Sequence, residues 1–169
     1  YAAFYLVRNN FALALPAILK AHPEYSKVQL GWAMTGLLTA YGLAKFIMGA
    51  VSDRSNPRGF MALGLLLTSA VTFAFGTMPG IYGSLAVIVG LQTLNGWCNG
   101  MGWPPCGKTM VHWWSTRERG LTVSMWNVAH NVGGGLVAKL ALIGVLVFGG
   151  WGAKFYFPAL VAALVAVLI

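Results

Sequence analysis

Three cationic or titratable side chains, those of Arg8, Lys45 and His130, stand inside long apolar runs of the sequence. Arg8 and His130 are each about 11–12 residues from the nearest polar end of their run, or roughly 17–18 Å along a helix. The three acidic residues all fall in polar segments between the runs. Arginine suits bidentate contact with phosphate or carboxylate, and lysine adds a point charge, so these residues favour an anionic ligand.

Structural roles for the same residues are also open. Lys45 can extend its ammonium group to the inner interface of a membrane, and His130 can be a neutral core histidine bonded to Asn127 or to a carbonyl group. Arg8 keeps its charge, so a structural role requires a carboxylate at its depth, where the sequence has none. Lys139 lies on the opposite side of its helix from His130, and we expect it to snorkel or pack.

Aromatic and amide side chains share helical faces with the buried cations. Tyr5 precedes Arg8 by about one turn, and Tyr41 precedes Lys45 by one turn. Such stripes often serve helix packing alone, but together with the cations they can enclose a cavity for an anion. The predicted substrate-binding residues are Arg8, Lys45, His130, Tyr5, Tyr41 and Asn127.

The composition predicts that these residues lie in a membrane. The chain is 58% hydrophobic and 8% charged, whereas a soluble domain carries roughly 25% charged residues. Its net charge of +8 is scattered rather than clustered, which argues against a nucleic-acid partner. A helix of about 20 residues crosses a bilayer, and the runs are too long and uniform for a barrel. We expect helices at 1–19, 28–51, 59–78, 82–111, 119–148 and from 153 to 169.

The expected fold is therefore an all-α bundle of six transmembrane helices. Because both ends of the chain fall within apolar runs, we interpret residues 1–169 as a fragment whose first and last helices are truncated. Loops 52–58 and 114–119 carry more cations than the opposite loops, which places them in the cytoplasm. Loops 52–58 and 114–119 carry four cations: Arg54, Arg58, Arg117 and Arg119. The loops on the other side carry three: Lys20, Lys27 and Lys154.

Helix-breaking residues and amides are concentrated in the fourth and fifth runs. Gln92, Asn95 and Asn99 form a polar stripe, and Pro104-Pro105 interrupts the hydrogen-bond ladder of the fourth helix. The glycines at 133–135 allow close approach of another backbone or a bend. Helices that bend or slide beside a central cavity are what alternating access requires.

No sequence pattern predicts a cofactor, a metal site or an enzyme. Cys98 and Cys106 are expected to be small packing residues. A phosphate-binding loop of the ATPase type is absent, so an ATP-driven pump is unsupported. Catalysis would need carboxylates at membrane depth, a metal cluster or a nucleophile beside a base, and the apolar runs offer none of these.

The segment from Gly49 to Arg58, GAVSDRSNPR, resembles the loop signature of the major facilitator superfamily between its second and third helices. Asn56 stands at the position of a second glycine, and asparagine tolerates left-handed backbone better than most residues. The resemblance implies a conformational latch, with charge interactions near the helix ends. Its residues here are Gly49, Asp53, Arg54 and Arg58.

Three longer segments are similar to the organophosphate:phosphate antiporters of that superfamily: YLVR at 5–8, GWPPCGKTMVHWW at 102–114 and WNVAHNVGGG at 126–135. The similarity implies that Arg8 holds phosphate together with an arginine of the C-terminal half, assisted by Lys45 and His130. It also implies exchange of inorganic phosphate for glycerol 3-phosphate across a bacterial inner membrane. Asn9 departs from the pattern, because close relatives carry lysine there.

Other functions remain open from the sequence. A hexose-phosphate or phosphoglycerate carrier of the same family would recognise phosphate in the same way. A transporter-like sensor would bind a sugar phosphate without moving it. In each case the expected partners are a phosphorylated small molecule, inorganic phosphate for a carrier, the lipid bilayer and the C-terminal half of the same protein.

Overall fold

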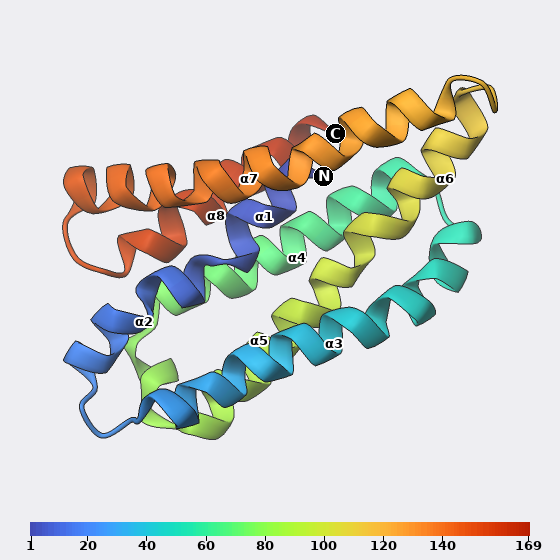
Figure 1. Ribbon diagram of the computed structural model, residues 1–169. Helices are drawn as coiled ribbons and strands as arrows, with labels where there is room; N and C mark the ends of the chain where they lie inside the picture. Colours follow the sequence, from blue (N-terminus) through green and yellow to red (C-terminus); the bar gives the residue numbers. More distant parts are fainter.

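Helices make up nearly the whole of the computed structural model, which describes residues 1–169. The elements run side by side as one elongated bundle (Figure 1). In chain order they are α1 (Ala2–Arg8), α2 (Asn10–Ala21), α3 (Lys27–Asp53), α4 (Pro57–Thr77), the 3-10 turn η1 (Pro79–Gly83), α5 (Leu85–Asn99), the 3-10 turn η2 (Gly100–Gly102), α6 (Trp103–Trp113), α7 (Arg119–Phe148) and α8 (Ala153–Leu168).

The bundle has the six crossings that the apolar runs predict. Four stretches are long and apolar enough to span a membrane: α1 with α2, then α3, α4 and α7. The run α5–η2–α6 and the 16-residue α8 supply the other two. The loops after α3 and α6 lie together at one end, and the turns after α2, α4 and α7 lie at the other (Figure 1). The all-α membrane fold is therefore confirmed.

Two of the expected helices are broken. The first is interrupted at Asn9, which has φ −94° and ψ −1° and separates α1 from α2, whereas Pro16 lies inside α2 without ending it. The fourth is interrupted by η2, just before the two prolines that the sequence marks as the break. The prolines occupy the first turn of α6, where the missing N–H group has no helical partner to lose.

Apolar packing lies on both sides of Arg8 along the chain. Phe4, which is fully buried, belongs to a cluster with Leu65 and Val137. Phe11 belongs to a second cluster, where its ring meets Phe75 at a centroid distance of 5.8 Å. The backbone on either side of Arg8 is therefore held by close-packed side chains, whose volume changes are felt by their neighbours.

Only some of the glycines serve close packing. A Cβ atom on Gly96 of α5 would collide with the carbonyl group of Leu37 on α3, and one on Gly133 of α7 would collide with that of Ala2 on α1. By contrast, Gly134 and Gly135 have no atom within 4 Å of an added Cβ. Of the three consecutive glycines on α7, the first alone allows a close helix approach.

Candidate functional site

Arg8 lies at the end of α1 between two tyrosine rings. Its guanidinium carbon is 4.4 Å from the ring centre of Tyr5 and 4.0 Å from that of Tyr41 on α3. A cation over an aromatic face is attracted by the ring quadrupole. The one ion pair in the structure joins His22 to Glu24, in the turn after α2. Arg8 is therefore a partly buried cation without an acidic partner.

A hydrogen-bonded network on α4 and α5 orients the Arg8 side chain. Arg8 Nε donates to Asn99 Oδ1 at 3.2 Å, and Asn99 is fully buried. The amide nitrogen of Asn99 donates in turn to Thr68 Oγ1 at 2.6 Å. Because that nitrogen is committed as a donor, the amide oxygen of Asn99 must face Arg8.

The same network supports the break between α1 and α2. Carbonyl groups in the last turn of a helix lose their regular partners. Here the Val7 carbonyl accepts from Thr72 Oγ1 at 3.0 Å and from Asn95 Nδ2 at 3.3 Å. Asn95 Oδ1 accepts in turn from Thr68. Buried side chains of α4 and α5 thus hold both the backbone before Arg8 and its guanidinium group.

Tyr41 links the two cations of the site. The Lys45 ammonium nitrogen is 4.1 Å from the centre of the Tyr41 ring, so this ring contacts both Arg8 and Lys45. The Tyr41 hydroxyl is 3.2 Å from that of Tyr1. Lys45 is half-buried and has no acidic partner. The spacing of Tyr41 and Lys45 along α3 places both on the face that meets α1.

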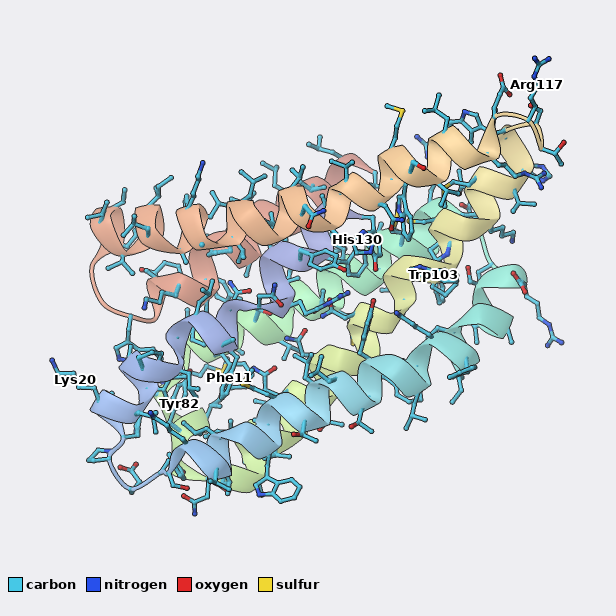
Figure 2. The ribbon with its side chains drawn as sticks, viewed as in Figure 1. Phe11, Lys20, Tyr82, Trp103, Arg117 and His130 are labelled. Carbon is cyan, nitrogen blue, oxygen red and sulfur yellow. The ribbon has the colours of Figure 1, made fainter.

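His130 closes the site from α7. Its ring centre is 5.2 Å from that of Tyr1, 5.2 Å from that of Tyr5 and 5.1 Å from that of Trp126. His130 Nδ1 is 3.0 Å from the Asn127 carbonyl oxygen. A carbonyl oxygen can only accept, so Nδ1 carries the proton and Nε2 is left for another partner. Figure 2 shows His130 near the middle of the bundle, between α7 and α1.

The structure brings five of the six predicted site residues into one chain of contacts. They are Arg8, Tyr5, Tyr41, Lys45 and His130. The sixth residue, Asn127, contacts His130 through its backbone carbonyl group and is itself exposed. The predicted site left out Tyr1, Trp126 and Asn99. Asn99 belongs to the polar stripe, Tyr1 precedes Tyr5 by one helical turn, and Trp126 precedes His130 by one turn.

The loop after α3 is held by a residue that the motif did not name. Lys108 of α6 donates to the carbonyl oxygens of Ser52 at 3.2 Å, Asp53 at 2.9 Å and Ser55 at 3.0 Å. A cation at the carbonyl end of a helix is favourable, because the last carbonyls lack helical partners.

The latch residues that the resemblance names make no ion pairs with one another. The side chains of Asp53, Arg54 and Arg58 are exposed. Gly49 has no atom within 4 Å of an added Cβ. The four residues thus share one end of the bundle, where their charged groups are free to meet other partners.

The arrangement is that of an all-α membrane protein with a cationic site. Within a bundle of six helical crossings, α1, α3 and α7 bring together a half-buried cluster of cations and tyrosines. Residues 1–169 match the Major Facilitator Superfamily over their whole length. The chain belongs to this family. The family is one of transporters, and the chain is accordingly not an enzyme.

Individual relatives align with the entire chain. A glycerol-3-phosphate transporter of Bacillus subtilis is 47% identical, and the chain covers 38% of its length. A probable hexose phosphate transport protein of Chlamydia trachomatis is 36% identical, with 36% of its length covered. The membrane sensor protein UhpC of Escherichia coli is 37% identical, with 37% covered. The chain therefore spans little more than a third of these relatives.

Proposed function

We propose that the chain is the N-terminal six-helix half of an antiporter that exchanges glycerol 3-phosphate for inorganic phosphate by alternating access. The observation that carries this proposal is the Arg8 guanidinium, held between Tyr5 and Tyr41 with no carboxylate partner. Its charge is free for a ligand anion. The 47% identity to a glycerol-3-phosphate transporter supports this choice of organic substrate.

In this mechanism Arg8 is the phosphate anchor. The Nε group is already bonded to Asn99, so phosphate would meet the remaining N–H groups of the guanidinium. Lys45 would attract the anion, and His130 would offer Nε2 to a phosphate oxygen. An arginine of the C-terminal half would bind the phosphate from the opposite side. The C-terminal half would also supply the remaining walls of the cavity.

The proposed location is a bacterial inner membrane, with loops 52–58 and 114–119 in the cytoplasm. Both loops lie at the same end of the bundle (Figure 1). Arg117 points outward there, and Lys20 points outward at the other end (Figure 2). The excess of arginine in the two loops supports the orientation. At that end, Gly49, Asp53, Arg54 and Arg58 would latch the two halves in one conformation.

The experiment uses the complete transporter in proteoliposomes loaded with phosphate. Arg8→Ala and Arg8→Lys should each reduce exchange by about 100-fold or more, because two hydrogen bonds to a charged group are worth roughly 3–6 kcal/mol. Arg117→Ala removes an exposed loop arginine and is the matched control, with exchange near that of the wild type. Near-normal exchange by either Arg8 variant refutes the anchor role.

Two alternatives use the same anchor. The relatives include a hexose phosphate transport protein, so the organic substrate can be larger than glycerol 3-phosphate. Competition by a panel of phosphate esters distinguishes these carriers. The relatives also include a membrane sensor, and for a sensor the complete protein would bind a phosphate ester without counterflow.

A further inference from the structure

A small cavity lies beside Arg8, among α1, α2, α3 and α5. Its volume is about 70 Å³, and its polar lining consists of Arg8, Asn9 and Gln92, the rest being apolar side chains. Two lining residues carry a buried polar atom without a hydrogen-bond partner: Nη2 of Arg8 and Oε1 of Gln92. Gln92 is only 2% exposed. A donor and an acceptor are thus both unsatisfied at one cavity.

Leaving such groups unpaired is unfavourable, by about 1–3 kcal/mol for each buried group and more where it is charged. A water molecule needs roughly 10–15 Å³ of such space and between two and four polar partners. The cavity volume of about 70 Å³ exceeds what one water molecule needs. The guanidinium can only donate and the amide oxygen can only accept, so one water can serve both. Asn9 supplies a third polar group at the same cavity.

We propose that Gln92 is a positioning residue for the Arg8 guanidinium, acting through ordered water in this cavity. The inference rests on the proposed function. Gln92 and Asn99 are two turns apart on α5. Asn99 accepts directly from Arg8 Nε, and Gln92 would accept from Nη2 through water, so one helix would orient the guanidinium at two of its nitrogens. Nη1 then remains for the phosphate oxygens. The polar stripe on α5 is thereby an orienting surface for the anchor as well as packing between helices.

The first test compares Gln92→Leu and Gln92→Glu in the complete transporter, with phosphate exchange measured in proteoliposomes. Gln92→Leu removes the acceptor and should raise the apparent KM for phosphate about tenfold, the size of one hydrogen bond to a charged group. The maximal rate should change much less. Ser69→Ala is the matched control. Ser69 Oγ is also buried and unpaired, but it lines a different cavity between α4 and α8, so the KM should be unchanged.

Gln92→Glu gives a signature that a packing role cannot produce. An ionised carboxylate at the cavity would pair with Arg8 and compete with phosphate, so exchange at neutral pH should fall by more than in Gln92→Leu. Lowering the pH protonates the new carboxyl group and should restore exchange relative to the wild type at the same pH. An unchanged KM in Gln92→Leu, or a loss in Gln92→Glu that is independent of pH, overturns the proposal.

A second measurement does not depend on transport. Gln92→Leu and Arg8→Met, singly and together, form a double-mutant cycle read from the Tm of the complete protein in detergent. Coupled groups give non-additive shifts, and we expect the double variant to lose less than the sum of the single losses. Additive shifts overturn the coupling. If the wild type fails to exchange phosphate, the proposed function fails, whereas this cycle still decides whether Gln92 acts on Arg8.

Discussion

The guanidinium carbon of Arg8 lies 4.0 Å from the centre of the Tyr41 ring. The two residues come from different helices, α1 and α3, and the ring also meets the ammonium group of Lys45 at 4.1 Å. Arg8 and Lys45 therefore both contact one aromatic ring, and neither is paired with a carboxylate. This arrangement holds positive charge in place without neutralising it, which suits the anion binding and release that we propose.

The Tyr41 ring should matter more than its hydroxyl group. Tyr41→Leu removes the aromatic face and should weaken phosphate binding by about 3- to 30-fold, the range of a partly desolvated cation–π contact. Tyr41→Phe keeps the face and loses the contacts of the hydroxyl group, such as that with Tyr1, so its affinity should stay within about threefold of the wild type. The phosphate affinities of both variants can be measured from the inhibition of exchange by external phosphate. Equal losses in the two variants would contradict the role assigned to the ring.

Asn99→Asp should disable the anchor by giving it a carboxylate. The new oxygen would stand where Asn99 Oδ1 now accepts from Arg8 Nε at 3.2 Å, and an ion pair there would compete with substrate. Phosphate affinity should fall at least about tenfold. Gln29→Glu adds the same charge in the first turn of α3, away from Arg8, and should leave affinity unchanged. Binding to the purified complete protein provides the measurement, and wild-type affinity in Asn99→Asp would count against an orienting role for this network.

Lys108→Met should loosen the loop after α3. The variant loses three hydrogen bonds to the carbonyl groups of residues 52, 53 and 55. Trypsin should then cleave at Arg54 or Arg58 faster than in the wild type, because opening of the loop exposes its backbone. Lys20→Met removes an exposed lysine at the other end of the bundle and is the control. Identical cleavage rates in the wild type and Lys108→Met would show that the three bonds do not hold the loop.

Gly96→Ala should destabilise the bundle, because its Cβ would collide with the Leu37 carbonyl where α5 meets α3. Overpacking of this kind costs typically about 1–3 kcal/mol. Gly90→Ala lies on the same helix with no atom within 4 Å of the added Cβ, and there alanine should be neutral or stabilising by up to about 1 kcal/mol. The Tm values of the two variants in detergent should therefore move apart. A Tm for Gly96→Ala at or above that of Gly90→Ala would contradict the close contact with α3.

The sequence by itself determined the membrane fold and the chemical character of the site. Hydrocarbon offers no hydrogen bonds to the backbone, so long apolar runs can only become helices or strands of a closed barrel, and their length excludes strands. The start of α7 at Arg119 and its end at Phe148 were predictable, because polar residues and glycines flank the run. The positions of Arg8, Lys45 and His130 within apolar runs, with the acids outside them, already predicted a site for an anion.

The tertiary structure decided which groups meet. Helical spacing assigns residues to a face of their own helix, but it does not state which neighbour that face will meet. The contact of Arg8 with Tyr41 and Asn99 therefore required the bundle to bring side chains of α3 and α5 within reach of α1. The break at Asn9 depends on donors from Thr72 and Asn95, which are remote in the chain. For the same reason, only the bundle could show that Gly133 allows a close approach while its two neighbours face open space.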